Sequence, residues 1–300
     1  MSDFRCAAEA RARGDELAGT ASTVRGFLLL EHAGPWGVDA LRDARLPDGL
    51  GAHLRAASRR HGVRVLLARR PGRRGREGRA RVFAARAAGA GSWLETTELD
   101  RIDDVRDLDL ALLGAGRSLG LEPVDGPLFA VCTHGRHDAC CAELGRPVAL
   151  ALADGQHADA TWEVSHVGGD RFAGNLVVLP RGLYYGALDP GSASAVAAAS
   201  AAGEVLLDHL RGRSDLPMAA QVADVALRTA HGLTGLDDVR PEGVRVDGDL
   251  TTARFEVSGH GLRDVVVRRA PGAATHQLTC SARRANAIPR HEVVEVRDAP

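Results

Sequence analysis

The sequence predicts an α/β fold built on a mixed β-sheet. The main indication is the order of elements in residues 125–212, where a strand, a helix and a second strand precede two adjacent strands and a closing helix. Residues 24–120 show a similar order. The chain has 300 residues, of which 45% are hydrophobic, and this is enough apolar material for more than one hydrophobic core.

The elements of residues 125–212 follow from short apolar runs separated by turn-forming residues. We predict strands at 127–131, 161–165, 175–179 and 182–185, and helices at about 139–153 and 192–210. Pro180 and Arg181 separate the last two strands, which predicts a tight turn between antiparallel neighbours. A strand, a helix, a strand, a hairpin and a helix, in this order, are typical of a thioredoxin-like domain.

Residues 24–120 predict a related but less regular set of elements. We expect strands at 27–31, 63–68 and 81–85 and a helix at about 39–60. Phe27–Trp36 occupies the place that Phe129–Asp138 has in the second half, but it contains no cysteine. We interpret this as a weak internal duplication, with a degenerate thioredoxin-like domain at 1–120 that lacks ligands and a complete thioredoxin-like domain at 121–212.

The remaining residues, 213–300, predict a small α+β extension. We expect a helix near 218–229 and strands around 243–246, 252–257, 264–268 and 276–280. Alternating polar and apolar residues in these strands indicate a half-exposed antiparallel sheet. His276, Leu278 and Cys280 would share one face of the last strand, where we expect buried core positions rather than a further pair of ligands.

The composition excludes several classes of protein. The formal net charge is −1, so the chain lacks the positive field of a nucleic-acid-binding protein. An arginine-rich stretch at 69–81 predicts a solvated loop or, as the alternative, a docking patch for an acidic redox partner. The amino terminus has no apolar core of signal-peptide length, and the longest apolar runs are too short to cross a membrane. We therefore expect a soluble, cytoplasmic protein.

Metal-binding residue types gather after two of the predicted strands. Cys132 follows the strand at 127–131, and Asp138 is the expected N-cap of the helix whose first turn contains Cys140 and Cys141, either of which could supply the second thiolate. His166 follows the next parallel strand, and Asp170 lies four residues beyond it. A right-handed crossover places both strand ends at one edge of the sheet. Two thiolates, an imidazole and a carboxylate supply four ligands for iron or zinc.

Each of these residues also has a simpler explanation. Adjacent cysteines are often small buried hydrophobic residues, and a single histidine after a strand is often structural. Asp170 could pair with Arg171 instead of a metal. His134 and His137 lie in the same loop as Cys132 and are rival ligands, although we expect them to lie beside the site or to face solvent.

Two segments carry a recognisable motif, Cys132–Cys141 and Trp162–Asn175, and Leu176–Gly186 continues the second. Together they resemble the signature of the sucrase/ferredoxin-like family. The resemblance covers most of the chain, but its specific motifs lie between residues 132 and 186. It implies a thioredoxin-like ferredoxin that holds a [2Fe–2S] cluster and transfers electrons.

The family pattern pairs two cysteines, with eight residues between them, with a His-x-x-x-His motif. It implies thiolate ligands at Cys132 and Cys141, on the buried iron, and an imidazole ligand at His166, on the outer iron. The second family histidine falls on position 170, which is Asp here. We therefore expect Asp170 as the fourth ligand.

This ligand set predicts the reduction potential of the cluster. With a core charge of about +2, two thiolates, one imidazole and one carboxylate leave about −1, between about −2 for four thiolates and about 0 for two thiolates with two imidazoles. We expect a potential between the His-ligated class, at roughly −150 to +300 mV, and the all-cysteine plant class near −400 mV.

The functional prediction is a one-electron carrier or an oxidoreductase component, rather than a catalyst with its own substrate. No dinucleotide-binding or flavin motif is recognisable, so we expect a separate redox partner protein. The alternative is a thioredoxin-like binding or structural module that holds zinc or no metal. Thiol–disulfide chemistry at Cys140 and Cys141 is a third possibility, but the Cys-x-x-Cys spacing is missing.

Overall fold

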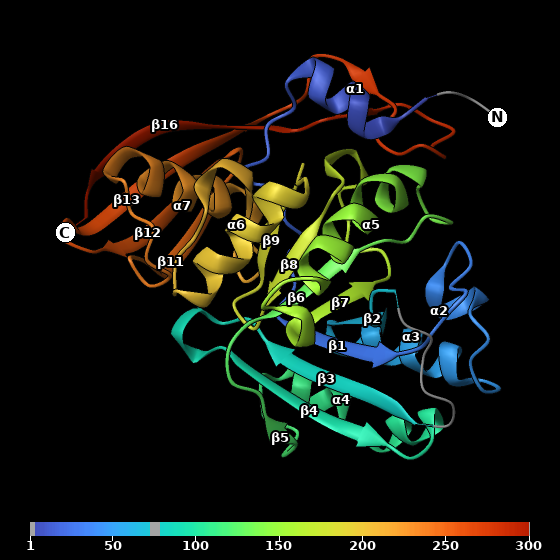
Figure 1. The fold of residues 1–300 in the computed structure, drawn as a ribbon. Coiled ribbons are helices and arrows are strands. Elements are labelled where there is room, and N and C mark those ends of the chain that lie inside the picture. Colours follow the sequence, from blue (N-terminus) through green and yellow to red (C-terminus); the bar gives the residue numbers. More distant parts are fainter. Residues whose placement is uncertain (1–3, 73–78, 300) are drawn as a thin grey trace.

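The computed structural model describes residues 4–72 and 79–299 and confirms the predicted α/β class (Figure 1). The main sheet is formed by β1 (Gly26–Glu31), β2 (Val63–Arg69), β3 (Ala80–Arg86), β4 (Trp93–Leu99), β5 (Glu122–Pro123), β6 (Leu128–Cys132), β7 (Thr161–Val164), β8 (Leu176–Leu179), β9 (Leu183–Tyr185) and β10 (Leu210–Arg213). Their order in this ten-stranded sheet is β10-β9-β8-β6-β7-β2-β1-β3-β4-β5.

The strands of the second half have thioredoxin-like connectivity. β6 is parallel to β7 and antiparallel to β8, and β8 is antiparallel to β9. Helix α5 (Ala139–Ala153) forms the crossover between β6 and β7, and α6 (Pro190–Ala201) follows β9. The helix predicted at 139–153 matches α5, because Asp138 caps its amino terminus by accepting a hydrogen bond from Cys140 N at 2.9 Å.

The first half has the same strand order and directions. β1 is parallel to β2 and antiparallel to β3, and β3 is antiparallel to β4. β2 also pairs antiparallel with β7, which joins both halves in one continuous sheet. Equal connectivity does not require common descent, so the duplication stays a prediction, as do the domain boundaries at residues 120 and 212.

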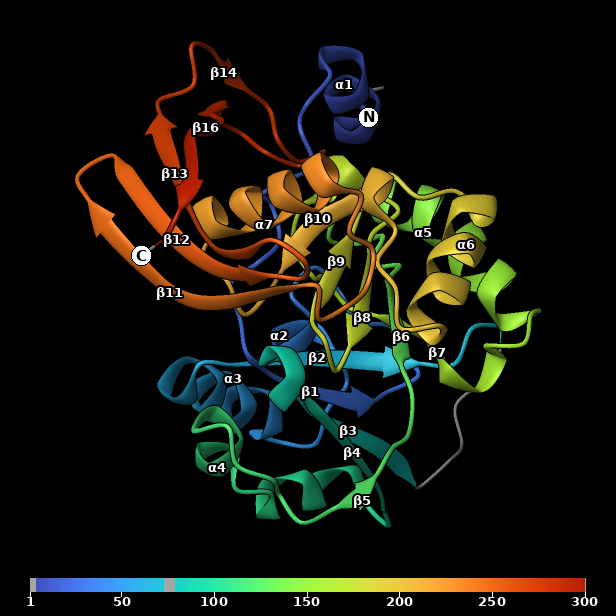
Figure 2. The same ribbon diagram turned by 90° about the vertical axis from the view of Figure 1, so that its left-hand side faces the viewer.

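The two halves share one hydrophobic core. Phe27 and Phe83 of the first half pack in the same cluster as Trp162 and Tyr184 of the second, and the rings of Phe83 and Trp162 lie 5.2 Å apart. Figure 2 shows β1 and β2 running across the direction of β8 and β9. Helices α3 (Leu50–His61) and α4 (Leu110–Gly114) pack on the other face of the first half, and α5 and α6 on the other face of the second.

Two of the predicted helices were too long. The helix expected at 39–60 is divided into α2 (Ala40–Asp43) and α3, because Pro47 lies between them and Gly49 precedes α3 in a left-handed conformation. The helix expected at 192–210 ends at Ala201. The left-handed Gly203, with φ +80°, follows it, and Leu210–Arg213 instead forms β10 beside β9.

The extension after β10 combines one helix with a four-stranded antiparallel sheet. Its elements are α7 (Met218–His231), β11 (Val239–Asp247), β12 (Leu250–Val257), β13 (Gly261–Ala270) and β16 (Arg290–Asp298), with the sheet order β11-β12-β13-β16. Leu227 of α7 packs against Phe255 of β12 in a separate core. β16 was not predicted, because both of its faces are exposed and no alternation marks it.

The prediction of a strand at 276–280 was wrong. Only β14 (Thr275–His276) forms there, paired with β15 (Asn286–Ala287), and Cys280 lies in the following turn. His276, Leu278 and Cys280 therefore do not share a strand face. The arginine-rich stretch runs from the end of β2 to the start of β3, and its residues 73–78 lie outside the described residues.

Shorter helical elements complete the described chain. Helix α1 (Cys6–Arg13) lies beside the loop that connects β13 with β16 (Figure 1). Short 3-10 helices occupy Gly89–Gly91, Ile102–Asp107, Ala158–Ala160, Asp170–Phe172 and Leu207–His209. Each helix within residues 4–72 and 79–299 is too short or too polar to cross a lipid bilayer.

Candidate metal centre

Cys132, Cys141 and His166 meet at the sheet edge predicted from the sequence. Cys132 ends β6, and β6 pairs in parallel with β7, so Cys132 lies opposite Val164, two residues before His166. Cys141 lies in the first turn of α5. One ligand atom of each residue can be chosen so that all three lie within 4.8 Å of one another. The topology therefore brings two thiols and an imidazole to one point.

Burial differs across this group. Cys132 and Cys141 are 1% and 0% exposed, and Asp170 is 4% exposed. The side chain of His166 keeps 28% of its surface accessible and lines an open depression together with Ser58, Gly62 and Arg64. The thiols thus form the closed side of the group, and His166 forms the side that solvent or a partner can reach.

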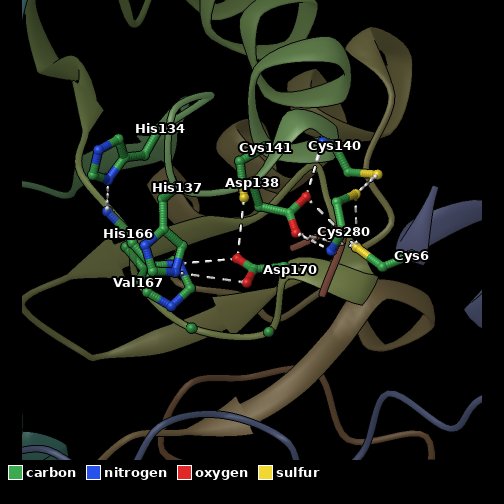
Figure 3. A network of polar contacts seen from close by, with 12 residues as sticks. Cys6, His134, His137, Asp138, Cys140, Cys141, His166, Val167, Asp170 and Cys280 are labelled. Atoms are coloured by element: carbon green, nitrogen blue, oxygen red, sulfur yellow. Dashed lines mark hydrogen bonds and ion pairs between the residues drawn. The ribbon is translucent and has the colours of Figure 1, made fainter. Parts of the chain in front are cut away.

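Asp170 lies next to His166 and Cys141. Its Oδ1 is 2.9 Å from Nδ1 of His166 and accepts a hydrogen bond from Sγ of Cys141 at 3.2 Å (Figure 3). The contact with His166 is short, but Nδ1 has no partner in hydrogen-bond geometry. In a tetrahedral metal site, bonds of about 2.0 Å to oxygen and about 2.1 Å to nitrogen separate the two ligand atoms by about 3.3 Å. The pair is therefore close to the spacing of two ligands on one ion.

The protonation states fit a cluster of mutually stabilised charges. The hydrogen bond between the thiols of Cys141 and Cys132, together with the imidazole of His166, holds the pKa of Cys132 well below its usual value. The same contact with Cys132, together with burial, raises the pKa of Cys141. Burial opposes a charge on His166, but Asp170 and Cys132 outweigh it and raise the pKa of His166 to about 9. Burial also opposes the Asp170 carboxylate, yet His166 lowers its pKa. A bound cation would stabilise both the Cys132 thiolate and the Asp170 carboxylate.

The histidines of the cysteine loop have different positions. His134 is buried, its Nε2–H donates to the carbonyl of Gly37 at 2.8 Å, and its Nδ1 accepts a hydrogen bond from the backbone of His166 at 3.2 Å. Both of its nitrogens are occupied, so His134 supports the site and does not bind a metal.

His137 retains a free ligand position. Its Nδ1–H donates to the carbonyl of Val38 at 3.1 Å, its ring stacks on His166 with centroids 3.8 Å apart, and its Nε2 lies 3.8 Å from Oδ2 of Asp170. One nitrogen of His137 falls within 4.8 Å of ligand atoms of both His166 and Asp170. His137 therefore lies beside the site, as expected, and its Nε2 is on the side of Asp170.

Arg211 shapes the loop between His166 and Asp170, and the sequence reading did not identify it. This guanidinium is 1% exposed and donates to the carbonyl of Gly168 at 3.0 Å, to Asn175 Oδ1 at 2.8 Å and to Thr20 Oγ1 at 3.1 Å. Gly169, with φ +82°, leaves room for it, because a Cβ there would meet Arg211 at 2.2 Å. The glycine pair before Asp170 was the available signal, but no local pattern could indicate an arginine so far along the chain.

Cys140 points away from this group. Its sulfur lies 3.4 Å from that of Cys280, near Cys6 (Figure 3). Cys141 instead groups with Cys132. Consecutive positions on a helix are about 100° apart, so neighbouring cysteines face different sides. Of the two, Cys141 is the one placed to act with Cys132 and His166.

Comparison with known proteins identifies one family. Neither the curated proteins nor the solved structures contain a significant match. A family model described as sucrase/ferredoxin-like matches residues 17–212, which is more than half of the chain and includes Cys132, Cys141, His166 and Asp170. The chain therefore belongs to the sucrase/ferredoxin-like family.

Proposed function

We propose that the chain is an electron-transfer protein that holds a [2Fe–2S] cluster between β6, α5 and the loop after β7. The observation that carries this proposal is the convergence of two buried thiols with a partly exposed imidazole and a carboxylate. Membership of a family with a ferredoxin-like name supports it.

The residues present fit such a cluster by their chemistry. Cys132 and Cys141 would hold the inner iron as thiolates, and His166 and Asp170 would hold the outer iron. The Nδ1 atom of His166 supports this assignment, because it lies 2.9 Å from Oδ1 of Asp170 but outside hydrogen-bond geometry, as two ligands of one ion do. When bound, the cluster would supply one-electron oxidation and reduction.

The surrounding residues would tune and protect this centre. The burial of Cys132 and Cys141 excludes water from the thiolates. Arg211 fixes the loop before Asp170 and adds a buried positive charge near the site. His166 faces the depression that contains Arg64, so electrons would pass on this side to a partner with an acidic surface.

The carboxylate sets the expected reduction potential. Asp170 adds one negative charge relative to a second imidazole, which stabilises the oxidised state. We expect a potential between roughly −150 mV, the lower end of the His-ligated class, and about −400 mV, the all-cysteine plant class. A redox titration that gives a value outside this interval would contradict the ligand assignment.

Anaerobic purification followed by optical spectroscopy and metal analysis tests the cluster itself. About two irons and two sulfides per chain, with visible absorption that bleaches under dithionite, are expected. A colourless protein without iron at this site would refute the proposal. The parallel test uses Cys132→Ser, which should remove the iron, with Ala142→Ser, at a half-buried position of α5, as the control.

A single zinc ion is the second candidate for this site. The ligand atoms of Cys132, Cys141 and His166 lie within 4.8 Å of one another, a spacing that suits one tetrahedral ion. Zinc proteins are colourless, so the spectrum distinguishes the two candidates. About one zinc that is lost in Cys132→Ser, without iron or sulfide, would favour this alternative.

A further inference from the structure

Three cysteines and an aspartate form a second group on the other side of α5. Cys6 lies in α1, Cys140 in the first turn of α5, and Cys280 in the turn after β14 (Figure 3). Asp138 is the N-cap of α5. One ligand atom of each residue can be chosen so that all four lie within 4.8 Å of one another.

The distances match the edges of a tetrahedral site. The sulfur of Cys280 lies 3.4 Å from that of Cys140 and 3.6 Å from that of Cys6, and Cys6 Sγ lies 3.5 Å from Oδ2 of Asp138. Bonds of about 2.3 Å to sulfur and about 2.0 Å to oxygen give edges of about 3.8 Å between sulfurs and about 3.5 Å between sulfur and oxygen. All three measured contacts lie within about 0.4 Å of these values.

Burial removes the three thiols and the carboxylate of this group from most contact with water. Cys6, Cys140 and Asp138 are 0%, 1% and 2% exposed, and Cys280 is half-buried. All three cysteines are free thiols, and one disulfide would leave the third sulfur buried beside it. A metal ion could bind all three sulfur atoms at once.

The carboxylate is held in position for this role. Oδ1 of Asp138 accepts a hydrogen bond from Cys140 N at 2.9 Å, and Oδ2 accepts one from Cys280 N at 2.6 Å. Each carboxylate oxygen has two lone pairs, so one remains on each for a metal. Outer hydrogen bonds of this kind are typical of the carboxylates that bind metals.

Positive side chains offset the charge of the group. Three thiolates and one carboxylate around a divalent ion leave a net charge of about −2. The guanidinium of Arg5 interacts electrostatically with Cys140 and Cys280, and that of Arg171 interacts with Cys6. These arginines lower the electrostatic cost of burying an anionic metal complex, and they also form ion pairs with Glu143 and Asp15.

We propose that Cys6, Asp138, Cys140 and Cys280 bind one structural zinc ion. Soft thiolates in a closed tetrahedral arrangement select zinc, and a site with no open position serves stability rather than catalysis. The ion joins three segments that are distant in sequence: α1, the start of α5 and the turn that contains Cys280. It thereby fastens the C-terminal extension to the half that carries the candidate iron–sulfur site, and it does not depend on that site's identity.

Metal analysis of the full-length protein and two cysteine variants tests this site. Wild type, expressed with zinc supplied, should contain about one zinc per chain in addition to iron. Cys280→Ser should lower zinc at least about tenfold and leave iron unchanged, while Cys132→Ser should remove iron and leave zinc unchanged. Ser281→Ala changes the same turn without removing a ligand and should retain both metals.

The zinc and iron contents of these variants distinguish the two sites, even if the metal assigned to one of them is wrong. Zinc that disappears only in Cys132→Ser, or zinc content that is equal in wild type and Cys280→Ser, would overturn the second site. Circular dichroism should show that Cys280→Ser is folded, and Cys6→Ser should give the same selective loss of zinc.

Thiol alkylation and intact mass provide an independent readout. In the native protein Cys280, the half-buried cysteine of the group, should resist alkylation until a chelator removes the zinc, and all five cysteines should be modified after denaturation. A mass lower by two hydrogens, with Cys140 and Cys280 linked in a peptide map without reductant, would show a disulfide and refute the zinc site.

Discussion

Oδ1 of Asp170 lies 2.9 Å from Nδ1 of His166, at the end of a loop that two left-handed glycines turn toward the buried thiols. In the pattern that the sequence resembles, position 170 carries a second histidine. In the proposed cluster, the carboxylate would therefore replace a neutral ligand and add one negative charge. At this position the candidate centre departs from the family pattern.

Asp170→His should raise the reduction potential, because it replaces an anionic ligand with a neutral imidazole and stabilises the reduced state. Asp170→Asn should lower the iron content, since an amide is a weaker ligand. A dye-equilibrated optical redox titration of wild type and Asp170→His makes the comparison. An unchanged or lower potential in Asp170→His would show that Asp170 is not bound to the cluster.

His137→Ala should leave the iron content nearly unchanged, because His166 and Asp170 complete the proposed ligand set without it. His53→Ala, at an exposed position of α3, controls for the loss of an imidazole. Iron and sulfide analysis gives the answer. If His137→Ala lost as much iron as Asp170→Asn, the free nitrogen of His137 would be a ligand.

Gly169→Ala should disturb the loop before Asp170. A Cβ at φ +82° is strained, at a cost of about 1–2 kcal/mol, and it would also lie 2.2 Å from the buried guanidinium of Arg211. We expect a lower unfolding temperature together with loss of iron. Gly155→Ala is the matched control, because its Cβ would meet only atoms at 3.7 Å or more. Equal thermal unfolding curves for the two variants would contradict the role of this loop.

Arg211→Lys should also weaken the site. A lysine ammonium cannot reproduce the divergent hydrogen bonds to Gly168, Asn175 and Thr20, and each lost bond to a buried charge costs about 1.5–3 kcal/mol. Urea denaturation followed by circular dichroism measures the loss. Arg146→Ala, an exposed position on α5, should change the unfolding free energy by less than about 0.5 kcal/mol. A similar small change in Arg211→Lys would argue against a structural role for the guanidinium.

Phe83→Ala should destabilise both halves together. The ring is 5% exposed and lies in the core shared with Trp162, so truncation should cost about 3–5 kcal/mol. Absorbance of the cluster and circular dichroism should be lost in one common transition. Val38→Ala, at an exposed site, is the control. Two separated transitions would show that the halves unfold independently.

Local patterns predicted much of this molecule. Asp138 as an N-cap gave the start of α5, and the parallel placement of β6 and β7 brought Cys132 and His166 together as expected. Pairing between distant segments could not be anticipated in the same way. The contact of Cys6 with Cys280 and the reach of Arg211 to Thr20 depend on how whole elements pack, and no sequence spacing encodes them.

The errors have similar causes. The residues after the Ala-rich α6 were predicted to continue the helix, yet the helix ends before Gly203 and Leu210–Arg213 forms a strand beside β9. β16 escaped prediction because neither of its faces is buried. Tertiary context decided both segments, which is where intrinsic propensity is least informative.

The carbonyl groups of Gly37 and Val38 orient two imidazoles of the other half. These acceptors belong to the main chain, so their positions depend on the backbone path between β1 and α2. Gly37 is itself part of that path, because its φ is +71° and a Cβ would lie 2.2 Å from Asp43, whereas the exposed Val38 can vary. Insertions or deletions between β1 and α2 would therefore be far more damaging than a substitution of Val38.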